Sequence, residues 1–190
     1  PTIDSLTTTS SENSITAVIT ASGYNGAKIE KYYYKLDNND YIETTTSSYT
    51  FESLENYSEH TISSYVVDSN GMLSVVKEFK TIVGIFPPEL EIIKNPGTMT
   101  SYSNQTDKVY GVIVTASNSG SLWGTEIYTA DSIVAKAVIH MGLAKAGETV
   151  LVKVQILPGQ SSYSGTTNNG ITSSSYGSYS SSYKILGLVE

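Results

Sequence analysis

The 190-residue chain contains no cysteine and no arginine, and only 15% of its residues are charged. Without cysteine, neither a disulfide bond nor a thiolate metal site can form, so stability has to come from packing. Without arginine, the bidentate guanidinium contact to phosphates and base edges is missing. The net charge of -7 also repels a polyanion. We therefore expect no nucleic acid partner.

Long apolar runs are also missing. No stretch approaches the roughly 18 apolar residues of a membrane-spanning helix, so we expect no membrane span in this sequence. The opening residues Pro1 to Asp4 lack the pattern of a signal peptide. Because the sequence opens directly on a strand pattern, we expect the chain to be a piece of a larger or processed protein.

Tyrosine is abundant instead, with 15 Tyr against 3 Phe and 1 Trp. Together with many Ser and Thr residues, this composition is favoured on pleated sheets and indicates a mainly β protein. Residues 1–84 carry five Lys against eleven acids, and residues 85–190 carry six Lys against seven acids. Pro87 and Pro88 form a stiff connector after this change in charge. We predict domains at 1–84 and 92–190, joined by a linker at 85–91.

The first half reads as a β-sandwich. Apolar and polar residues alternate with period two, and clusters of Gly, Asn and Asp separate the runs. The runs cover residues 14–21, 29–36, 49–54, 61–67 and 73–79. In the second run we place Tyr32, Tyr34 and Leu36 inward. We place Lys31, Tyr33 and Lys35 toward solvent.

The stretch from Leu54 through His60 and Tyr65 to Gly71 resembles the later strands of fibronectin type III modules. That family places a corner tyrosine six residues after the leucine, where this chain has His60. The resemblance leaves two options: His60 replaces the tyrosine hydrogen bond through a ring nitrogen, or it faces solvent. Such modules act as spacers, and the acidic surface favours solubility.

The second half has one convincing helix, at residues 131–141. We expect Thr129 or Asp131 to cap it and Gly142 to end it. Apolar residues surround the helix almost completely, which predicts burial. Strands are expected at 96–102, 109–115 and 149–157, and Gly147 is expected to turn the chain into the last of these. The last strand carries Val150, Val152, Val154 and Ile156 on one face.

Three ordered segments of the second half resemble the LCCL domain in its bacterial, cysteine-free form. They are LWGTEIYTADS at 122–132, AVIHMG at 137–142 and the Ser- and Tyr-rich run 157–185. The resemblance covers about residues 92–187 and implies two β-sheets around one central helix. It also implies that residues 163–179 are ordered, with Gly165, Gly170 and Gly177 in turns. Animal members anchor a disulfide where this chain has Ala135, so burial alone must hold the helix.

Catalytic and metal sites find little support. Only His60 and His140 could serve as a general base, and they fall in different predicted domains. We expect His140 to be buried and hydrogen-bonded. Glu126 and Asp131 could form a glycosidase pair, but the helix start already accounts for Asp131. Two distant histidines without cysteine cannot make a zinc site, so we expect no enzyme, metal or cofactor.

A ligand-binding surface is the sharper hypothesis. Aromatic faces with polar tips stack on sugars, and amides bind sugar hydroxyls. Alternatively, Trp123 and Tyr128 seal the ends of the helix while the other residues pack the sheet edges. The candidates are Tyr163, Asn168, Asn169, Tyr176, Tyr179, Trp123 and Tyr128.

These observations predict a non-enzymatic, extracellular binding or adhesion module. We expect it to recognise cell-surface carbohydrate or glycolipid within a bacterial surface protein or a phage tail or fibre. The alternative is a purely structural module that makes protein–protein contacts in a surface or virion assembly.

Overall fold

The computed structural model describes residues 1–189, which fall into two compact units, Pro1–Ile85 and the residues from Phe86 onward. We call them unit 1 and unit 2 and describe each by itself. The domain bounds expected from the sequence, 1–84, 85–91 and 92–190, stay predictions. Within the described residues, no helix has both the length and the apolar character needed to cross a membrane.

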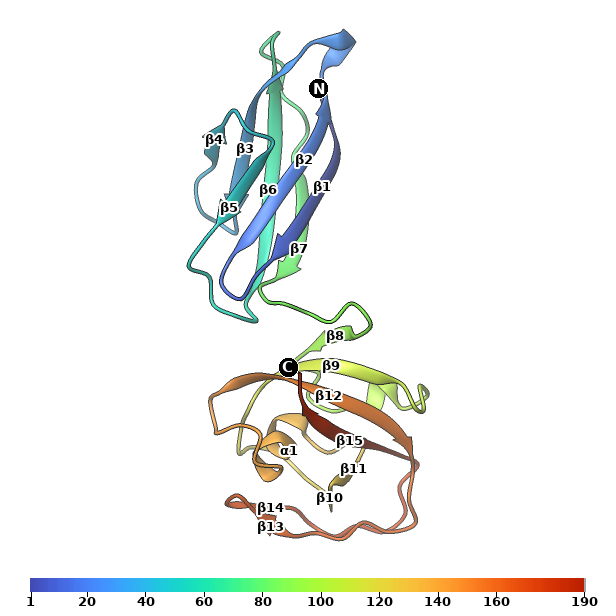
Figure 1. Cartoon of the computed structure of the whole chain (residues 1–190). Helices are drawn as coiled ribbons and strands as arrows, with labels where there is room; N and C mark the ends of the chain where they lie inside the picture. The colour runs from blue at the N-terminus through green and yellow to red at the C-terminus, as the bar shows by residue number, and fades with distance from the viewer. Residues whose placement is uncertain (190) are drawn as a thin grey trace. The chain divides into compact units, whose positions relative to one another are not determined.

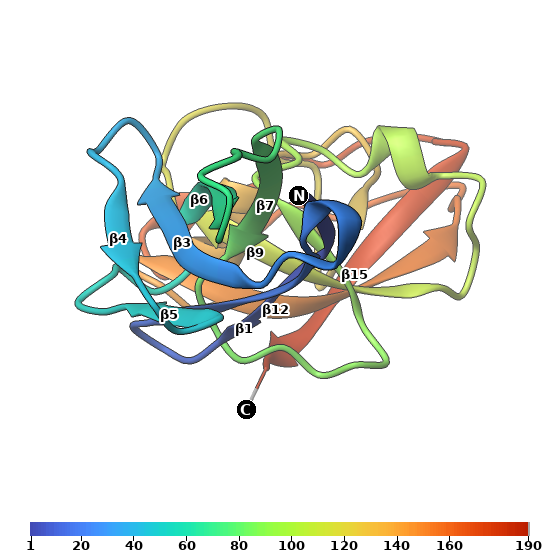
Figure 2. The ribbon, with the colours of Figure 1, turned by 90° about the horizontal axis from the view of Figure 1, so that it is seen from above.

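Unit 1 is a sandwich of two antiparallel sheets (Figures 1 and 2). One sheet has the order β1-β2-β5, with β1 at Thr2–Ser10, β2 at Ile15–Ser22 and β5 at Ser48–Phe51. The other has the order β4-β3-β6-β7, with β4 at Ile42–Thr44, β3 at Ile29–Leu36, β6 at Glu59–Asp68 and β7 at Lys77–Ile82. This arrangement is the expected fibronectin type III-like sandwich.

The period-two pattern places alternate side chains between the sheets of unit 1. Ile15, Ile62 and Val66 are fully buried there. The predicted orientation of β3 is confirmed: Tyr34 and Leu36 are buried, and Tyr32 packs against the same core. On the opposite face of β3, Tyr33 stacks on its cross-strand partner Tyr65 with ring centroids 4.4 Å apart.

Two strand predictions in unit 1 need correction. The run at 73–79 makes one isolated bridge, from Leu73 to Val67, and becomes a continuous strand only at Lys77, where β7 begins. Between them, Val75 is 82% exposed. The reason is that the Ser74 hydroxyl accepts the Val66 N–H at 3.0 Å, which interrupts the ladder beside β6. The run at 49–54 ends at Phe51 because Ser53 adopts a positive φ of 60°.

Unit 2 has a six-stranded sheet and a two-stranded one, with helix α1 (Val134–His140) contacting both (Figure 1). The larger sheet has the order β10-β11-β15-β12-β9-β8, and β13 pairs with β14 in the smaller. The bounds are β8 Glu91–Lys94, β9 Val109–Thr115, β10 Gly124–Thr125, β11 Ile127–Thr129, β12 Thr149–Pro158, β13 Thr167–Asn168, β14 Ile171–Thr172 and β15 Ser181–Leu188. The expected arrangement of two sheets around one central helix is confirmed.

The core of unit 2 lies between the larger sheet and α1. Val152, Val154 and Ile156 of β12 are fully buried, and Val150 packs against the same cluster, as the alternation predicts. The helix adds Ala137 and Val138, also fully buried. Ala135 is partly buried against this cluster, so packing holds the helix at this position, as expected.

The start of α1 differs from the prediction. The N-cap residue is Ile133, without a side-chain hydrogen bond, so neither Thr129 nor Asp131 caps the helix. Two backbone carbonyls replace the cap: Gly97 O accepts the Val134 N–H, and Ser121 O accepts the Ile133 N–H, both at 2.9 Å.

The predicted strand at 96–102 is therefore wrong as well. A turn at Gly97, with φ of 72°, presents its carbonyl to the helix, and Thr100–Tyr102 form a short 3-10 helix, η2. At the other end, Gly142 ends α1 as predicted. Its φ is 74°, and Leu143 N–H bonds to Val138 O at 2.9 Å. Gly147 adopts a φ of 89° before β12, which confirms the predicted turn.

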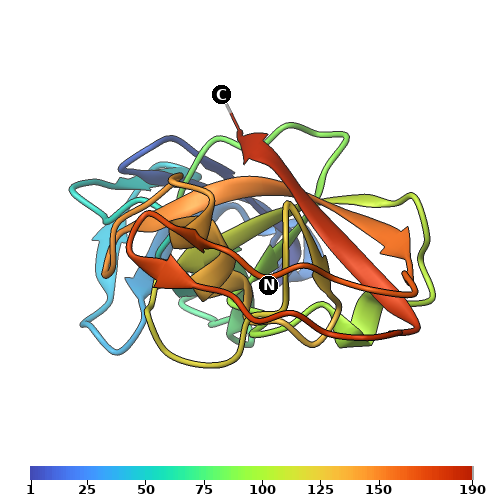
Figure 3. The ribbon, with the colours of Figure 1, turned by 90° about the horizontal axis from the view of Figure 1, so that it is seen from below.

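The Ser- and Tyr-rich run forms an irregular β-hairpin that crosses one side of unit 2 (Figure 3). Tyr163 and Tyr176 exchange two backbone hydrogen bonds, at 2.8 and 2.9 Å. Asn169 and Gly170, with φ of 50° and 76°, make the turn between β13 and β14. Gly165 has another role than the predicted turn, because a Cβ there would lie 2.5 Å from Ser173 O.

Candidate functional site

The seven candidate residues lie in three different environments of unit 2. Tyr128 and Tyr163 are buried, Trp123, Tyr176 and Tyr179 form a row of rings at the surface, and Asn168 and Asn169 occupy the hairpin turn. The structure therefore divides the seven candidates by position and exposure, whereas the sequence groups them only by residue type.

The two buried tyrosines are held in the interior of unit 2. Tyr128 bonds through its hydroxyl to His140 Nδ1 at 2.8 Å, and burial raises its pKa to about 12. The Tyr163 hydroxyl bonds to Ser182 Oγ at 2.6 Å and accepts the Gln160 N–H at 3.0 Å. Neither ring therefore offers an open face to a ligand.

Trp123, Tyr176 and Tyr179 form what we call the aromatic row. The ring centroids of Trp123 and Tyr176 are 5.8 Å apart, and those of Tyr176 and Tyr179 are 6.1 Å apart. Tyr176 is 46% exposed, and its two neighbours are half-buried. A parallel bridge between Trp123 and Ser174 holds the hairpin beside the segment that carries the tryptophan. Segments about fifty residues apart thus supply one aromatic surface.

Asp131 adds a carboxylate next to the aromatic row. Burial, and after it the neighbouring Asp131 carboxylate, raises the pKa of Tyr179. Among the described residues, Asp131 Oδ1 and the nearby Ser181 Oγ are buried without a hydrogen-bond partner. Buried polar atoms are normally paired, so an ordered water is the partner expected for these two oxygens.

The hairpin turn lines a polar hollow with a volume of about 460 Å³. Asn168 and Asn169 lie there with Glu126, which adopts a positive φ of 62°. Asn169 donates through its side chain to His140 O at 3.0 Å, which joins the turn to the end of α1. Glu126 lines this hollow and Asp131 does not, so they do not form one paired-carboxylate pocket.

The sequence suggests Glu126 and Asp131 only as a possible glycosidase pair, and it places neither Asp131 beside the aromatic row nor Glu126 at the hairpin turn. Asp131 was assigned to the helix start, because an acid before an apolar periodic run is a common signal for a cap. The position of Glu126 at the hollow has no local signal, since it depends on a left-handed backbone conformation that glycine or asparagine normally adopts.

His140 is buried and hydrogen-bonded, as predicted. It is 1% exposed, and its Nε2 lies 3.2 Å from Thr166 Oγ1 while Nδ1 faces Tyr128. The ring thus links α1 to β11 and to the hairpin.

His60 lies in a line of three side chains in unit 1. Its Nδ1 donates to Asp37 Oδ2 at 2.7 Å, and its Nε2 lies 2.8 Å from Ser58 Oγ. The order Ser, His, Asp resembles a hydrolytic triad. However, the Ser58 hydroxyl donates its proton to the backbone carbonyl of Glu55 at 2.5 Å, so it does not donate that proton to His60 as a catalytic serine would. His60 and Ser58 together reach the upstream backbone, as a corner tyrosine would.

We expect unit 1 to lose stability in acid through Asp37. Burial raises the pKa of this carboxyl, but hydrogen bonds from the Thr61 N–H and His60 outweigh it, and the pKa lies below its usual value. A lowered folded-state pKa stabilises the fold above about pH 4 and loses that contribution as the pH falls through the lowered value. Urea unfolding between pH 6 and 2, followed by amide NMR signals of β3 and β6, measures the effect.

The matched variant is Asp37→Asn, which keeps the size of the side chain. It should be less stable than the parent at pH 6 and show a smaller loss on acidification. An equal acid response in both proteins would exclude Asp37 as the source.

Among residues 1–189, no group of three or more His, Asp or Glu side chains could hold a metal ion.

Comparisons with solved structures return distant likenesses. The fibronectin(III)-like modules of CbhA from Clostridium thermocellum are 19% identical, with a TM-score of 0.33, over 42% of this chain and 97% of theirs. A structure of carbohydrate-binding modules from the β-sandwich superfamily is 12% identical, with a TM-score of 0.34, over 81% of this chain and 54% of that one. Chitinase ChiA74 from Bacillus thuringiensis is 13% identical, with a TM-score of 0.38, and the alignment covers 100% of this chain but 27% of the chitinase.

No curated protein sequence matches the chain. A family model does match within unit 2, over the segments that carry the tryptophan, the central helix and the hairpin. The model that matches is that of the LCCL domain, and it covers residues 93–183 of this chain.

Proposed function

We propose that unit 2 binds carbohydrate through the aromatic row. The observation that carries this proposal is the surface formed by Trp123, Tyr176 and Tyr179, with the Asp131 carboxylate beside Tyr179. The chain is then a non-enzymatic binding module, in which unit 1 serves as a spacer.

The chemistry of a sugar suits such a surface. Its C–H face packs on an aromatic ring, and its hydroxyls need acceptors placed beside that ring. The partly buried Asp131 carboxylate beside Tyr179 supplies an acceptor, and the tyrosine hydroxyls supply further polar contacts. The hollow at Asn168 and Asn169 offers amides to a second sugar unit on the same hairpin.

We further propose that the module works at a cell surface or on a virion, within a bacterial surface protein or a phage tail or fibre. Its ligand there is a cell-surface glycan or the sugar headgroup of a glycolipid. The combination of an acidic β-sandwich with a Tyr-, Ser- and Asn-rich domain supports this setting.

The test is a glycan array followed by titration of the best hits. Tyr176→Ala and Tyr179→Ala should each weaken binding by about fivefold, since one lost ring contact costs about 1 kcal/mol. The matched control is Tyr24→Ala, because Tyr24 is a 63% exposed tyrosine of unit 1. That control should bind like the parent.

Absence of glycan binding together with concentration-dependent oligomerisation would contradict the proposal. That outcome would favour the architectural alternative, in which the same exposed rings contact protein subunits of an assembly. Equal loss of binding in Tyr24→Ala would exclude the aromatic row as the specific site.

A further inference from the structure

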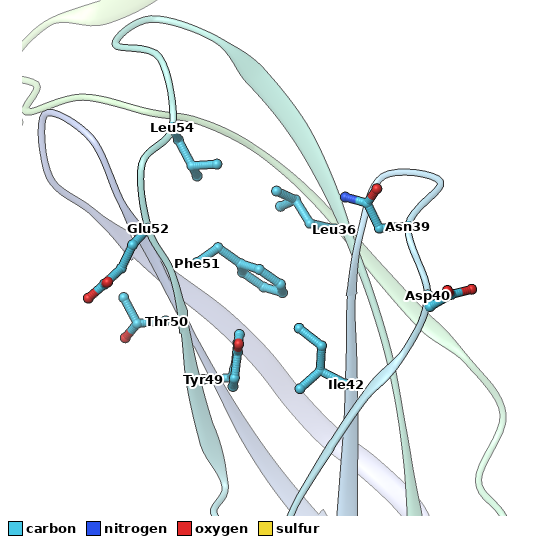
Figure 4. A pocket seen from close by; sticks show the side chains of 9 residues that line it. All are labelled: Leu36, Asn39, Asp40, Ile42, Tyr49, Thr50, Phe51, Glu52 and Leu54. Carbon is cyan, nitrogen blue, oxygen red and sulfur yellow. The ribbon is translucent and has the colours of Figure 1, made fainter.

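Unit 1 contains an apolar pocket at the side of the sandwich where β4 and β5 face each other (Figure 4). Its volume is about 400 Å³, and we call it the edge pocket. The side chains of Leu36, Ile42, Phe51 and Leu54 point toward one another across it (Figure 4). Such a lining suits an apolar group from another molecule.

Both strands beside the edge pocket are edge strands of their sheets. In the described residues, β5 is the last strand of the order β1-β2-β5, and β4 is the first of β4-β3-β6-β7. An edge strand carries backbone N–H and C=O groups that can pair with an added strand. The pocket is therefore next to backbone groups that can bind an extended peptide.

The register of β5 identifies these backbone groups. Ser47 O accepts the Ile19 N–H at 2.8 Å, and β5 pairs antiparallel with β2. Backbone bonds alternate along such a ladder, so the N–H and C=O of Thr50 point to the free edge. A strand added at that edge would bond to Thr50.

The same register determines which side chains of the added strand enter the pocket. Side chains opposite Tyr49 and Phe51 lie on the same face of the sheet as those two residues and point into the pocket. The side chain between them lies on the opposite face, with the Thr50 side chain, and points to solvent. The fitting segment therefore has two apolar side chains separated by one outward residue.

The charge around the edge pocket indicates which residue type suits the solvent-facing position of the added strand. Asp40 and Glu52 stand at opposite sides of the edge pocket, both exposed, and no lysine is found among the described residues that line it. Glu52 follows Thr50 by two positions and so continues its outward face. The first half of the chain also carries eleven acids against five lysines. Lysine beside the apolar residues would complement this charge.

We propose that the edge pocket binds an extended protein segment of alternating lysine and apolar residues, which adds as a strand to β5. This mode combines backbone pairing for affinity with a pocket for specificity. The edge pocket contains no residue of the aromatic row, so this proposal does not depend on carbohydrate binding by unit 2.

The probe is the peptide acetyl-Lys-Leu-Lys-Leu-Lys-amide, titrated into the isotope-labelled full chain and followed by amide NMR. The control is acetyl-Glu-Leu-Glu-Leu-Glu-amide, which has the same apolar residues and the opposite charge. We expect saturable shifts at Ser48 to Phe51 and at Ile42 with the lysine peptide, and at least about tenfold weaker binding of the control.

Two variants separate the contributions of charge and backbone. Asp40→Lys combined with Glu52→Lys should weaken the lysine peptide by about tenfold or more and strengthen the glutamate peptide. Thr50→Pro removes the N–H that points to the free edge and should also abolish binding. It leaves the backbone bonds to β2 intact but removes the hydroxyl contact with Thr16 at 2.9 Å.

Shifts scattered over other acidic surfaces, or binding unchanged by both variants, would overturn the proposal. The charge reversal lies on exposed residues, so it remains informative if Thr50→Pro disturbs the fold.

Discussion

Replacing Tyr183 by alanine should lower the unfolding free energy of unit 2 by about 3 to 5 kcal/mol. Tyr183 is fully buried on β15, where it pairs with Tyr128 of β11 and Ile156 of β12. Its ring centroid lies 5.5 Å from that of Tyr128. Alanine would leave a cavity between the middle strands and the helix, and few neighbouring groups can move to fill it.

The measurement uses the single tryptophan of the chain. Trp123 belongs to unit 2, so its fluorescence during urea unfolding reports that unit. The matched control is Tyr183→Phe, which keeps the ring and loses only the hydroxyl bond to Ser132 O at 3.3 Å. It should cost about 1 kcal/mol. A Tyr183→Ala effect no larger than that of the control would contradict the assigned position in the core.

His140→Ala should destabilise unit 2 by about 2 to 4 kcal/mol, by loss of packing and of hydrogen bonds. The side chain is 1% exposed and lies at the end of α1. Its removal opens a cavity and breaks the 2.8 Å hydrogen bond to the Tyr128 hydroxyl. The lost hydrogen bond in the core adds its own cost.

A double-mutant cycle with Tyr128→Phe separates these two costs. In the Tyr128→Phe background, His140→Ala should cost at least about 0.5 kcal/mol less, because the hydroxyl is already absent. Strictly additive effects would mean that the bond between the two side chains contributes nothing. Trp123 fluorescence again provides the readout.

Local patterns were sufficient for most elements of the fold. The alternation in β3 and β12 predicted which residues face the core, because a strand turns successive side chains to opposite sides. Gly142 ended the helix as predicted, since glycine adopts the left-handed conformation that this end requires. The family resemblance, rather than composition, predicted that the Ser- and Tyr-rich run is ordered.

The failures of prediction occurred where distant segments compete with a local signal. Thr129 and Asp131 have suitable side chains for a cap, but carbonyls of Gly97 and Ser121 occupy the helix start instead. The Ser74 hydroxyl similarly interrupts the predicted strand at 73–79. In both places the sequence pattern was sound, and a hydrogen bond from elsewhere in the chain decided the outcome.

The sequence by itself therefore determined that this protein is mainly β, has one buried helix, and carries an aromatic, amide-rich segment in its second half. Only the tertiary structure decided that Tyr128 and Tyr163 are internal while Trp123, Tyr176 and Tyr179 form a surface. Residue type reports what a side chain can bind. Its exposure depends on which remote strands and loops cover it, and no local pattern contains that information.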